Sequence, residues 1–307
     1  MRTLAGRKIL LGPSSFAAGD KSPLRVLEEA GLIIIDNPHK RKLTKPELME
    51  LAAGGVTGLI AGLETLDREV MEKTAIKVIS RCGSGMSNVD QQAAKELGIS
   101  VYSTPDAPTT AVAEITIGAL LALLRRIAPL NAKMHMRIWE KHTGFELAGK
   151  TVCIVGLGRI GRRVAKIVAA FDAAVIAVDP YLAAAPDDVS LVTMDEALAR
   201  ADIISLHASG EHCIIGGAEL DRMKKGVYIL NAGRGGLVDE TALAEHLRAG
   251  KVAGAWIDTF AEEPYSGELC GLPQAILTPH IGSYSYEGRL KMEMQASENL
   301  LEGLRLL

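Results

Sequence analysis

Residues 150–170 read KTVCIVGLGRIGRRVAKIVAA, and this stretch decides the fold. The apolar, partly β-branched run 151–155 predicts a buried strand, and the segment after Gly161 has helical spacing. The motif GLGRIG lies between them. In such a motif Gly156 permits a tight turn, Gly158 lets a pyrophosphate approach the backbone, and Gly161 lets helix and strand pack closely, with Arg159 and Ile160 beside the phosphates. The stretch therefore predicts the first βα unit of a dinucleotide-binding domain.

An acidic residue follows at the expected distance. The next apolar run ends in Asp179, which lies 18 positions (179 − 161) beyond the last glycine. A carboxylate roughly 20 residues after this motif binds the ribose diol of NAD and repels the 2′-phosphate of NADP. The sequence therefore favours NAD as the cofactor. The alternative is that Asp179 only caps the end of its strand.

Strand and helix patterns alternate along the whole chain. Before residue 103 the runs KILLG, LIIID, TGLIAG, KVISR and GISVYS are separated by helical segments, and the rhythm restarts at KTVCIVG. One long helix is predicted over 110–131, and a final one over 286–307. Such alternation is typical of α/β proteins with parallel sheets. We expect two doubly wound domains with a cleft between them: residues 1–103 with 285–307 bind substrate, and residues 104–284 bind the dinucleotide.

Composition excludes several classes of protein. The 307 residues carry a net charge of −3, with Lys and Arg dispersed, so a nucleic-acid partner is not expected. The most apolar window, ITIGALLALL, is too short to cross a bilayer. The four cysteines lie far apart and suggest neither a disulfide framework nor a metal site. With no apolar leader at the start of the chain, a reducing cytoplasm is the expected location.

Three residues are candidates for acid–base chemistry on a keto acid. Reduction of such a substrate needs a cation to hold and polarise it and a group that protonates the forming alkoxide. Arg234, in NAGRGG, and His280, in LTPHIG, both follow predicted strands, where open α/β sheets bind ligands. Glu263, in FAEEP, can orient the imidazole and raise its pKa. Alternatively, Arg234 bridges surface carboxylates, Glu263 is solvated and His280 caps a strand.

In ordered segments over nearly its whole length, the chain resembles the D-isomer-specific 2-hydroxyacid dehydrogenase family, and especially its phosphoglycerate dehydrogenase-like members. The matching segments are KVISRCGSGMSNVD, STPDAPTTAVAEITIGALLALLRRI, ELAGKTVCIVGLGRIGRRVA, VDPY, ILNAGRGGLVDE, WIDTFAEEP and LTPHIGSYS. The resemblance implies a flavodoxin-like substrate domain, a Rossmann dinucleotide domain, NAD as cofactor, a small 2-hydroxy or 2-keto acid as substrate, and a homodimer formed through the dinucleotide domain.

The resemblance also implies a role for individual residues. Arg234 orients the substrate, Glu263 tunes the histidine, and His280 gives and takes the proton. The backbone at Ser84 and Gly85 cradles the substrate carboxylate. The remaining implied cofactor contacts are Thr110, His207, Ala232, Asp258 at the nicotinamide carboxamide, and Gly282.

The chain departs from the family pattern in two places that bear on function. The segment after His207, ASGEHCIIGG, is shorter than usual, and this puts the wall near the nicotinamide ribose in doubt. The loop AGLETLD lacks the arginine with which phosphoglycerate dehydrogenases hold a phosphate, so the identity of the acid stays open. Arg81 is either an anchor for an anionic substrate tail or a solvated charge at a strand end.

Other functions remain as alternatives. On the same scaffold the chain could be a sensor that binds NAD(H) as a ligand, although Arg234, Glu263 and His280 argue against this. A formate- or phosphite-type oxidation is a third possibility. Trp139 and Lys141 could reach a substrate across a dimer interface, but an aromatic residue at the end of an amphipathic helix is more often a packing residue.

Overall fold

The computed structural model describes residues 4–186, 189–210 and 212–307. The chain forms two compact units. Unit 1 comprises Met1–Pro108 and Tyr284–Leu307, and unit 2 comprises Thr109–Ser283. Unit 1 is therefore made of two segments of the chain, with unit 2 inserted between them. Which ligand each unit binds stays a prediction.

Unit 1 contains a five-stranded sheet in the order β2-β1-β3-β4-β5, with every neighbouring pair parallel. This is a doubly wound order, in which the chain reverses direction across the sheet between β1 and β3. The elements of unit 1 are β1 (Lys8–Leu11), α1 (Ser22–Glu29), β2 (Ile33–Ile35), α2 (Lys45–Ala52), β3 (Val56–Ala61), α3 (Arg68–Lys73), β4 (Val78–Arg81), α4 (Gln91–Glu96), β5 (Ser100–Ser103) and α11 (Tyr286–Leu306).

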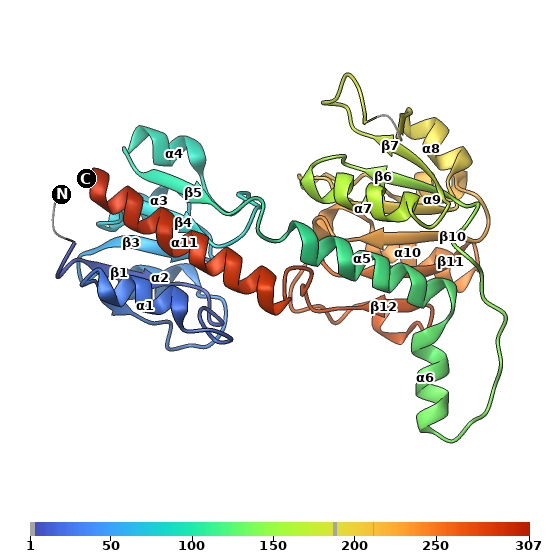
Figure 1. Ribbon diagram of the computed structural model, residues 1–307, viewed down its shortest axis with the longest axis horizontal. Coiled ribbons are helices and arrows are strands. Elements are labelled where there is room, and N and C mark those ends of the chain that lie inside the picture. The colour runs from blue at the N-terminus through green and yellow to red at the C-terminus, as the bar shows by residue number, and fades with distance from the viewer. Residues whose placement is uncertain (1–3, 187–188, 211) are drawn as a thin grey trace. The chain divides into compact units, whose positions relative to one another are not determined.

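Helices cover both faces of this sheet (Figure 1). One apolar layer joins the sheet to α1 and α11, and the other joins it to α2, α3 and α4. The helix α11 supplies Met292, Ala296 and Leu300, all buried, to the first layer. The last helix of the chain is thus part of the core of unit 1.

Unit 2 contains a seven-stranded parallel sheet in the order β12-β11-β10-β9-β6-β7-β8. Its winding reverses between β6 and β9. The elements of unit 2 are α5 (Thr109–Leu124), α6 (Ile127–His135), β6 (Thr151–Val155), α7 (Arg159–Ala169), β7 (Ala174–Val178), β8 (Ser190–Leu191), α8 (Met194–Arg200), β9 (Ile203–Leu206), α9 (Gly217–Arg222), β10 (Val227–Asn231), η1 (Gly235–Leu237), α10 (Glu240–Arg248), β11 (Val252–Ile257), η2 (Glu268–Gly271) and β12 (Ala275–Leu277).

The sheet of unit 2 is also covered on both faces. The helices α5 and α7 pack on one face, over a core that includes the fully buried Trp256. The helices α8, α9 and α10 pack on the other face. The prediction of two parallel α/β sheets is confirmed. The short strand β8 and the two 3-10 turns were not predicted, because two to four residues carry too little periodic signal.

The long helix predicted over 110–131 is interrupted. The helix α5 ends at Leu124, Arg126 adopts a left-handed conformation with φ of 52°, and α6 begins at Ile127. Pro129 lies in the first turn of α6, where its missing N–H has no partner to lose. The prediction was wrong here because the two residues at the break, Arg125 and Arg126, are good helix formers and give no local signal of a break.

None of the helices in the described part of the chain is both long enough and apolar enough to cross a membrane.

Candidate active site

The predicted site residues of unit 2 gather at one edge of its sheet. All seven strands are parallel, so their carboxyl ends meet at the same edge, and ligands of such sheets bind there near the reversal of strand order. Each of the strands β6, β7, β9, β10, β11 and β12 is followed by a predicted residue. These residues are, in chain order, Gly156, Asp179, His207, Ala232, Asp258 and His280.

The glycine turn after β6 has the geometry that a dinucleotide phosphate needs. Gly156 has φ of 89°, and a Cβ added there would lie 2.6 Å from the backbone nitrogen of Ala208. A Cβ on Gly161 would lie 2.1 Å from the carbonyl oxygen of Gly156. A Cβ on Gly158, in contrast, would meet no described atom within 4 Å. Two glycines are thus required by the fold, and the third faces open space at the start of α7.

The start of α7 is suited to an anion. Arg159 and Ile160 form its first turn after Gly158, which has no side chain to cap the helix. The free N–H groups and the dipole at a helix N-terminus attract phosphate. The residues present therefore fit the pyrophosphate of NAD.

Asp179 is held against the glycine turn. Its Oδ2 accepts a hydrogen bond of 2.8 Å from the backbone N–H of Leu157, and its Oδ1 accepts one of 3.0 Å from the backbone N–H of Tyr181. The carboxylate does cap its strand end, as the alternative stated, but it also lies beside the turn. A carboxylate oxygen accepts more than one hydrogen bond, so both oxygens can still bind a ribose hydroxyl.

His207 is a neutral side chain in this site. Burial lowers its pKa to about 4. Its Nε2 lies 2.8 Å from the Ser205 hydroxyl, and its buried Nδ1 has no hydrogen-bond partner among the described residues. A buried ring nitrogen without a hydrogen-bond partner is uncommon in folded proteins. Glu211, in the shortened segment that follows, lies outside the described residues.

His280 and Glu263 form a hydrogen-bonded pair. The Nδ1 of His280 lies 3.0 Å from both Oε1 and Oε2 of Glu263. Oε1 also accepts a hydrogen bond of 3.2 Å from the backbone N–H of Phe260, so the carboxylate is fixed from behind. The two side chains are 34% and 32% exposed. With Nδ1 engaged, Nε2 of His280 is the nitrogen left for proton exchange with a substrate.

Arg234 lies on a loop packed tightly against the segment that carries Glu263. Arg234 is half-buried, and its Nη1 donates a hydrogen bond of 2.7 Å to the carbonyl oxygen of Gly233. A Cβ on the next residue, Gly235, would lie 1.8 Å from the carbonyl carbon of Phe260. Only glycine lets these two loops approach so closely. The fold thus fixes the Arg234 loop next to the segment 260–263.

Asp258 and Thr278 position the histidine. Asp258 is buried, and its carboxylate accepts hydrogen bonds from the Thr278 hydroxyl at 2.6 Å and the N–H groups of Ile281 and Gly282 at 2.9 and 2.8 Å. The N–H of His280 donates to the carbonyl oxygen of Asp258 at 2.9 Å. This network surrounds a histidine in the left-handed region, with φ of 53°, where a residue with a side chain needs support.

The sequence analysis predicts Asp258 as a cofactor contact but does not single out Thr278. The hydroxyl of Thr278 also accepts a hydrogen bond of 3.0 Å from the Nε1–H of Trp256. The only available signal was a threonine two positions before the histidine. Nothing in the sequence showed that its partner would be an aspartate twenty residues earlier.

The remaining predicted cofactor contacts of unit 2 are Thr110, Ala232 and Gly282. Thr110 is exposed in the first turn of α5. Ala232 is half-buried and donates its N–H to the carbonyl oxygen of Leu206 at 3.2 Å. A Cβ on Gly282 would lie 2.9 Å from Oδ2 of Asp258. Gly282 therefore also serves the packing of the histidine loop.

In unit 1, Ser84 and Gly85 follow β4, and Ser84 is exposed. The preceding Gly83, with φ of 143°, donates its N–H to the Thr104 hydroxyl at 2.8 Å. This bond anchors the start of the loop. Its backbone is thus held by the neighbouring strand end.

Arg81, immediately before this loop, is only 7% exposed, and its Nη1 donates a hydrogen bond to the carbonyl oxygen of Cys82. The alternative of a solvated charge at a strand end is therefore wrong for Arg81. Nearby Glu64 is also buried, and burial raises its pKa. The loop after β3, which lacks the phosphate-binding arginine of phosphoglycerate dehydrogenases, thus presents a buried carboxyl group instead.

Three comparisons with known proteins agree. The family model described as "D-isomer specific 2-hydroxyacid dehydrogenase, NAD binding domain" matches residues 117–282. A D-3-phosphoglycerate dehydrogenase of Mycobacterium leprae is 39% identical over 284 residues, which are 89% of this chain and 52% of the relative. A hydroxypyruvate reductase of Thermotoga maritima is 35% identical over 296 residues, 93% of this chain and 95% of the relative.

Among solved structures, the TT0316 protein from Thermus thermophilus superimposes with a TM-score of 0.89 at 35% identity, covering 97% of each chain. This chain spans about half the length of the D-3-phosphoglycerate dehydrogenases it matches.

Proposed function

The chain belongs to the D-isomer specific 2-hydroxyacid dehydrogenase family and carries its NAD binding domain, and from this premise we propose that it interconverts a small D-2-hydroxy acid and the corresponding 2-keto acid with NAD. One observation carries the proposal: Nδ1 of His280 lies 3.0 Å from both oxygens of Glu263, at the carboxyl edge of a parallel sheet. A histidine held in this way is suited to general acid–base catalysis.

His280 exchanges the proton. During reduction, the Nε2–H of the protonated ring donates its proton to the carbonyl oxygen of the keto acid, and during oxidation Nε2 takes the hydroxyl proton. The carboxylate of Glu263 stabilises the imidazolium and keeps the ring oriented. When NAD is bound, its nicotinamide supplies or accepts the hydride.

The substrate is held by charge and by backbone groups. The guanidinium of Arg234 forms a bidentate hydrogen-bonded pair with a substrate carboxylate and polarises the neighbouring carbonyl. In unit 1, the N–H groups at Ser84 and Gly85 are the proposed backbone contacts to a substrate carboxylate. Gly156, Gly158, Arg159, Ile160 and Gly161 hold the pyrophosphate. The other proposed cofactor contacts are Thr110, Asp179, His207, Ala232, Asp258 and Gly282.

The decisive experiment is turnover with a panel of keto acids. Purified protein is mixed with NADH and glyoxylate, hydroxypyruvate, pyruvate or phosphohydroxypyruvate, and loss of NADH absorbance is followed, with NADPH in parallel. We expect turnover of one or more of these acids and a preference for NADH, since Asp179 repels a 2′-phosphate. Tight NADH binding without turnover of any acid would contradict the proposal and favour an NAD(H) sensor.

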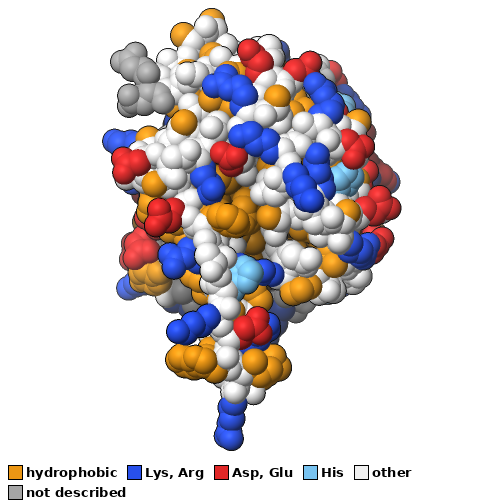
Figure 2. All heavy atoms as spheres, turned by 90° about the vertical axis from the view of Figure 1, so that its right-hand side faces the viewer, with side chains coloured by type: hydrophobic (Ala, Val, Ile, Leu, Met, Phe, Trp, Pro, Cys, Tyr) orange, Lys and Arg blue, Asp and Glu red, His pale blue; other side chains and the backbone are white. Residues whose placement is uncertain are grey.

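We also propose that the chain works as a homodimer in the cytoplasm. Six large apolar side chains between residues 127 and 145 are at least 45% exposed, and none of the residues of α6 is buried. Figure 2 shows hydrophobic side chains on the arm that projects at the bottom of the view, which is formed by α6 and the segment that follows it. The six are Ile127, Met134, Met136, Ile138, Trp139 and Phe145. Exposed apolar surface of this kind is typical of an interface.

The dimer is tested by analytical ultracentrifugation. The wild-type chain should sediment as a dimer, and the double variant Met136→Ser, Trp139→Ser should dissociate to monomers. The matched control is Phe171→Ser, which removes another exposed aromatic side chain, 38% exposed, away from the arm. A monomeric wild type would contradict the proposal. The cytoplasmic location is supported by four free cysteines.

A further inference from the structure

A second carboxylate lies close to the pair of His280 and Glu263, within unit 2. Glu240 is the first residue of α10 and is half-buried. Its Oε1 accepts a hydrogen bond of 2.8 Å from the backbone N–H of Ala261. The N–H before it, on Phe260, donates to Oε1 of Glu263 at 3.2 Å. Two glutamates thus hold consecutive N–H groups of the turn 260–263, which carries Glu263 itself.

Aromatic packing supports the two ends of this turn. The rings of Phe260 and Tyr265 stack with their centroids 4.3 Å apart, and the hydroxyl oxygen of Tyr265 accepts a hydrogen bond of 3.2 Å from the N–H of Leu269. Ala261, between the stacked rings in sequence, is exposed, and its N–H bonds to Glu240. Loss of Glu240 should therefore loosen the turn locally without unfolding the segment.

Capping of α10 does not account for this contact. An acidic residue in the first turn of a helix is favourable in any orientation that keeps its charge near the helix N-terminus. Asp239 already caps α10, since its Oδ1 accepts a hydrogen bond of 3.0 Å from the N–H of Ala242. The side chain of Glu240 instead reaches another segment, 21 residues further along the chain.

The place of Glu240 also carries an electrostatic cost. Burial raises the pKa of its carboxyl group, and the charges of Asp239 and Glu263 raise it further, against the hydrogen bond from Ala261. Like charges held close together disfavour ionisation of each other. Perturbed carboxyl groups of this kind are more frequent at functional sites than elsewhere.

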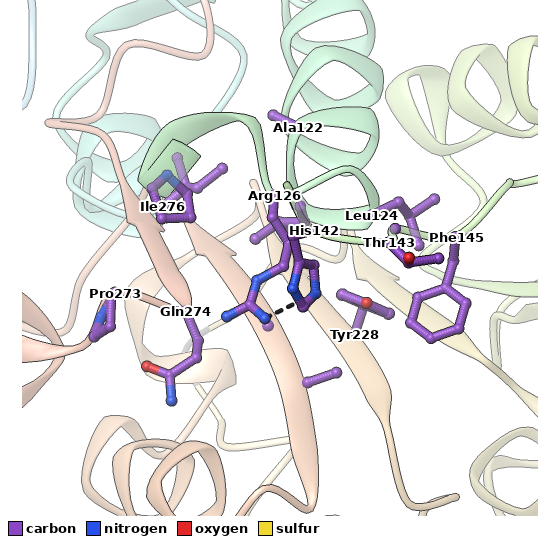
Figure 3. Close-up of a pocket in the computed structure, with 15 residues that line it drawn as sticks. Ala122, Leu124, Arg126, His142, Thr143, Phe145, Tyr228, Pro273, Gln274 and Ile276 are labelled. Carbon is purple, nitrogen blue, oxygen red and sulfur yellow. Dashed lines mark hydrogen bonds between the residues drawn. The ribbon is translucent and has the colours of Figure 1, made fainter. Parts of the chain in front are cut away.

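A histidine at the opposite edge of the same sheet has different surroundings. His142, which lines the pocket drawn in Figure 3, accepts a hydrogen bond of 2.9 Å at its Nε2 from Nη1 of Arg126. A neighbouring cation disfavours a protonated imidazole, whereas a neighbouring carboxylate favours it. The carboxylates of Glu263 and Glu240 thus suit the protonated ring of His280 that the proposed reduction needs.

We propose that Glu240 is a positioning residue of the active site: by holding the N–H of Ala261, it keeps both oxygens of Glu263 within hydrogen-bond distance of Nδ1 of His280. Glu240 acts through Glu263 and not on the substrate. The catalytic consequence rests on the proposed function, whereas the hold on the pair of Glu263 and His280 does not.

The first test is steady-state kinetics of the full chain with its best keto acid. Glu240→Ala should lower kcat about 10-fold with KM nearly unchanged, the range for losing a hydrogen bond to a charged acceptor that supports the general acid. Glu240→Gln keeps an acceptor oxygen and should restore most of the activity. The matched control is Glu262→Ala, which removes the exposed glutamate next to Glu263 and should leave kcat unchanged. Equal losses in Glu240→Ala and Glu262→Ala overturn the proposal.

Glu240→Asp separates the hydrogen bond from the charge. The shorter side chain keeps the negative charge at the start of α10 but does not reach Ala261, so kcat should fall as in Glu240→Ala. Full activity in Glu240→Asp would contradict the proposal, because charge alone would then be sufficient.

A double-mutant cycle tests whether Glu240 acts through Glu263. In the Glu263→Gln background the oriented carboxylate is already lost, so adding Glu240→Ala should lower kcat by less than about twofold. Losses that multiply in the double variant overturn the proposal, because Glu240 would then act independently of Glu263.

A spectroscopic test does not depend on turnover. Protein labelled with ¹⁵N-histidine should show a downfield proton resonance for the Nδ1–H of His280, which is bonded to Glu263 and is identified by its loss in His280→Gln. Glu240→Ala should weaken this resonance through faster exchange with water, and Glu240→Gln and Glu262→Ala should retain it. An unchanged resonance in Glu240→Ala overturns the proposal. If no keto acid is turned over but the resonance responds as expected, the proposed function fails and the positioning role stands.

Discussion

Unit 1 and unit 2 are both parallel, doubly wound sheets, but they treat charged side chains differently. In unit 1, Glu64 in the loop after β3 and Arg81 at the end of β4 are buried, and the side chains of the Arg289–Glu293 ion pair in α11 are only 17% and 4% exposed. In unit 2 the pair of His280 and Glu263 is about one-third exposed. Buried ion pairs fix a framework, whereas a partly exposed pair can exchange protons with a ligand.

The difference also shows that a histidine next to a glutamate is not by itself a catalytic signal. In unit 1, Nδ1 of His39 lies 3.4 Å from Oε1 of Glu47, which is also bound to Arg41. Glu47 and Glu263 each accept a hydrogen bond from a backbone N–H, but of the two histidines only His280 lies in the loop after β12, at the edge where the predicted site residues of unit 2 gather. Chemistry follows from the loop that carries a residue and not from the fold alone.

The largest expected effect separates these two histidines. His280→Ala should lower kcat for the best keto acid by roughly 10²- to 10⁴-fold, because the general acid is lost. His39→Ala should leave kcat unchanged. Steady-state kinetics of both variants measure the contrast. Turnover within a few-fold of wild type in the His280 variant would remove His280 from the mechanism.

The next effect concerns stability in unit 1. Glu293→Leu should destabilise the protein by about 3 kcal/mol, because it leaves the mostly buried Arg289 without its carboxylate. Urea unfolding measures the change, and kcat of the folded variant should stay near wild type. The exposed pair of Arg248 and Glu268, 2.6 Å apart, offers the control: Glu268→Leu should cost less than about 1 kcal/mol. Equal costs would contradict the contrast between buried and exposed pairs.

Lowering the pH from 7 to 5 should change the stability contributed by buried titratable groups in opposite directions in the two units. In unit 2 the pKa of His207 is about 4 in the folded protein and about 6.5 when unfolded, so its stabilising contribution is complete above pH 6.5 and falls as pH drops toward 4. The loss between pH 7 and 5 is on the order of 2 kcal/mol. In unit 1, burial raises the pKa of Glu64 and Glu293, so lower pH relieves a cost there.

Segment-resolved hydrogen exchange measures how the stability of each unit depends on pH. Between pH 7 and 5, after correction for intrinsic exchange, core amides of unit 2 should lose protection, and His207→Gln should reduce this loss. Core amides of unit 1 should not lose protection in the same way. An unchanged pH slope in the His207 variant would show that another group is responsible.

The smallest expected effect concerns Thr278, whose hydrogen bonds help to position the His280 loop. Thr278→Val removes the 2.6 Å hydrogen bond to Asp258 and the partner of Trp256, a change of about 1 kcal/mol. We expect kcat to fall about fivefold with KM nearly unchanged, and the pH optimum of kcat to shift because the histidine is less firmly held. Thr278→Ser keeps the hydroxyl and should restore both. A variant that loses stability but keeps the wild-type pH profile would assign Thr278 a structural role only.

Much of this arrangement could be predicted, since parallel strands bring all their carboxyl ends to one edge. Recognising the strands was therefore enough to place Gly156, Asp179 and His280 at the same edge. The burial of Arg81 could not be predicted, because a strand-end arginine has the same local sequence whether solvated or covered by the neighbouring layer. The break at Arg126 was hidden because arginine is a good helix former, so residues 125–126 continue the helical pattern of their neighbours.

The helix α11 has a consequence for how the protein is made. Residues 1–108 lack their final core layer until residues 286–306 have left the ribosome, whereas unit 2 is complete once residue 283 has emerged. At the usual pace of synthesis, the 198 residues from the end of the first segment to the end of α11 (306 − 108) take roughly 10 to 40 seconds. During that interval the apolar face of the first sheet that α11 will cover is exposed on the nascent chain. Unit 2 can therefore fold during translation before unit 1 receives its last helix.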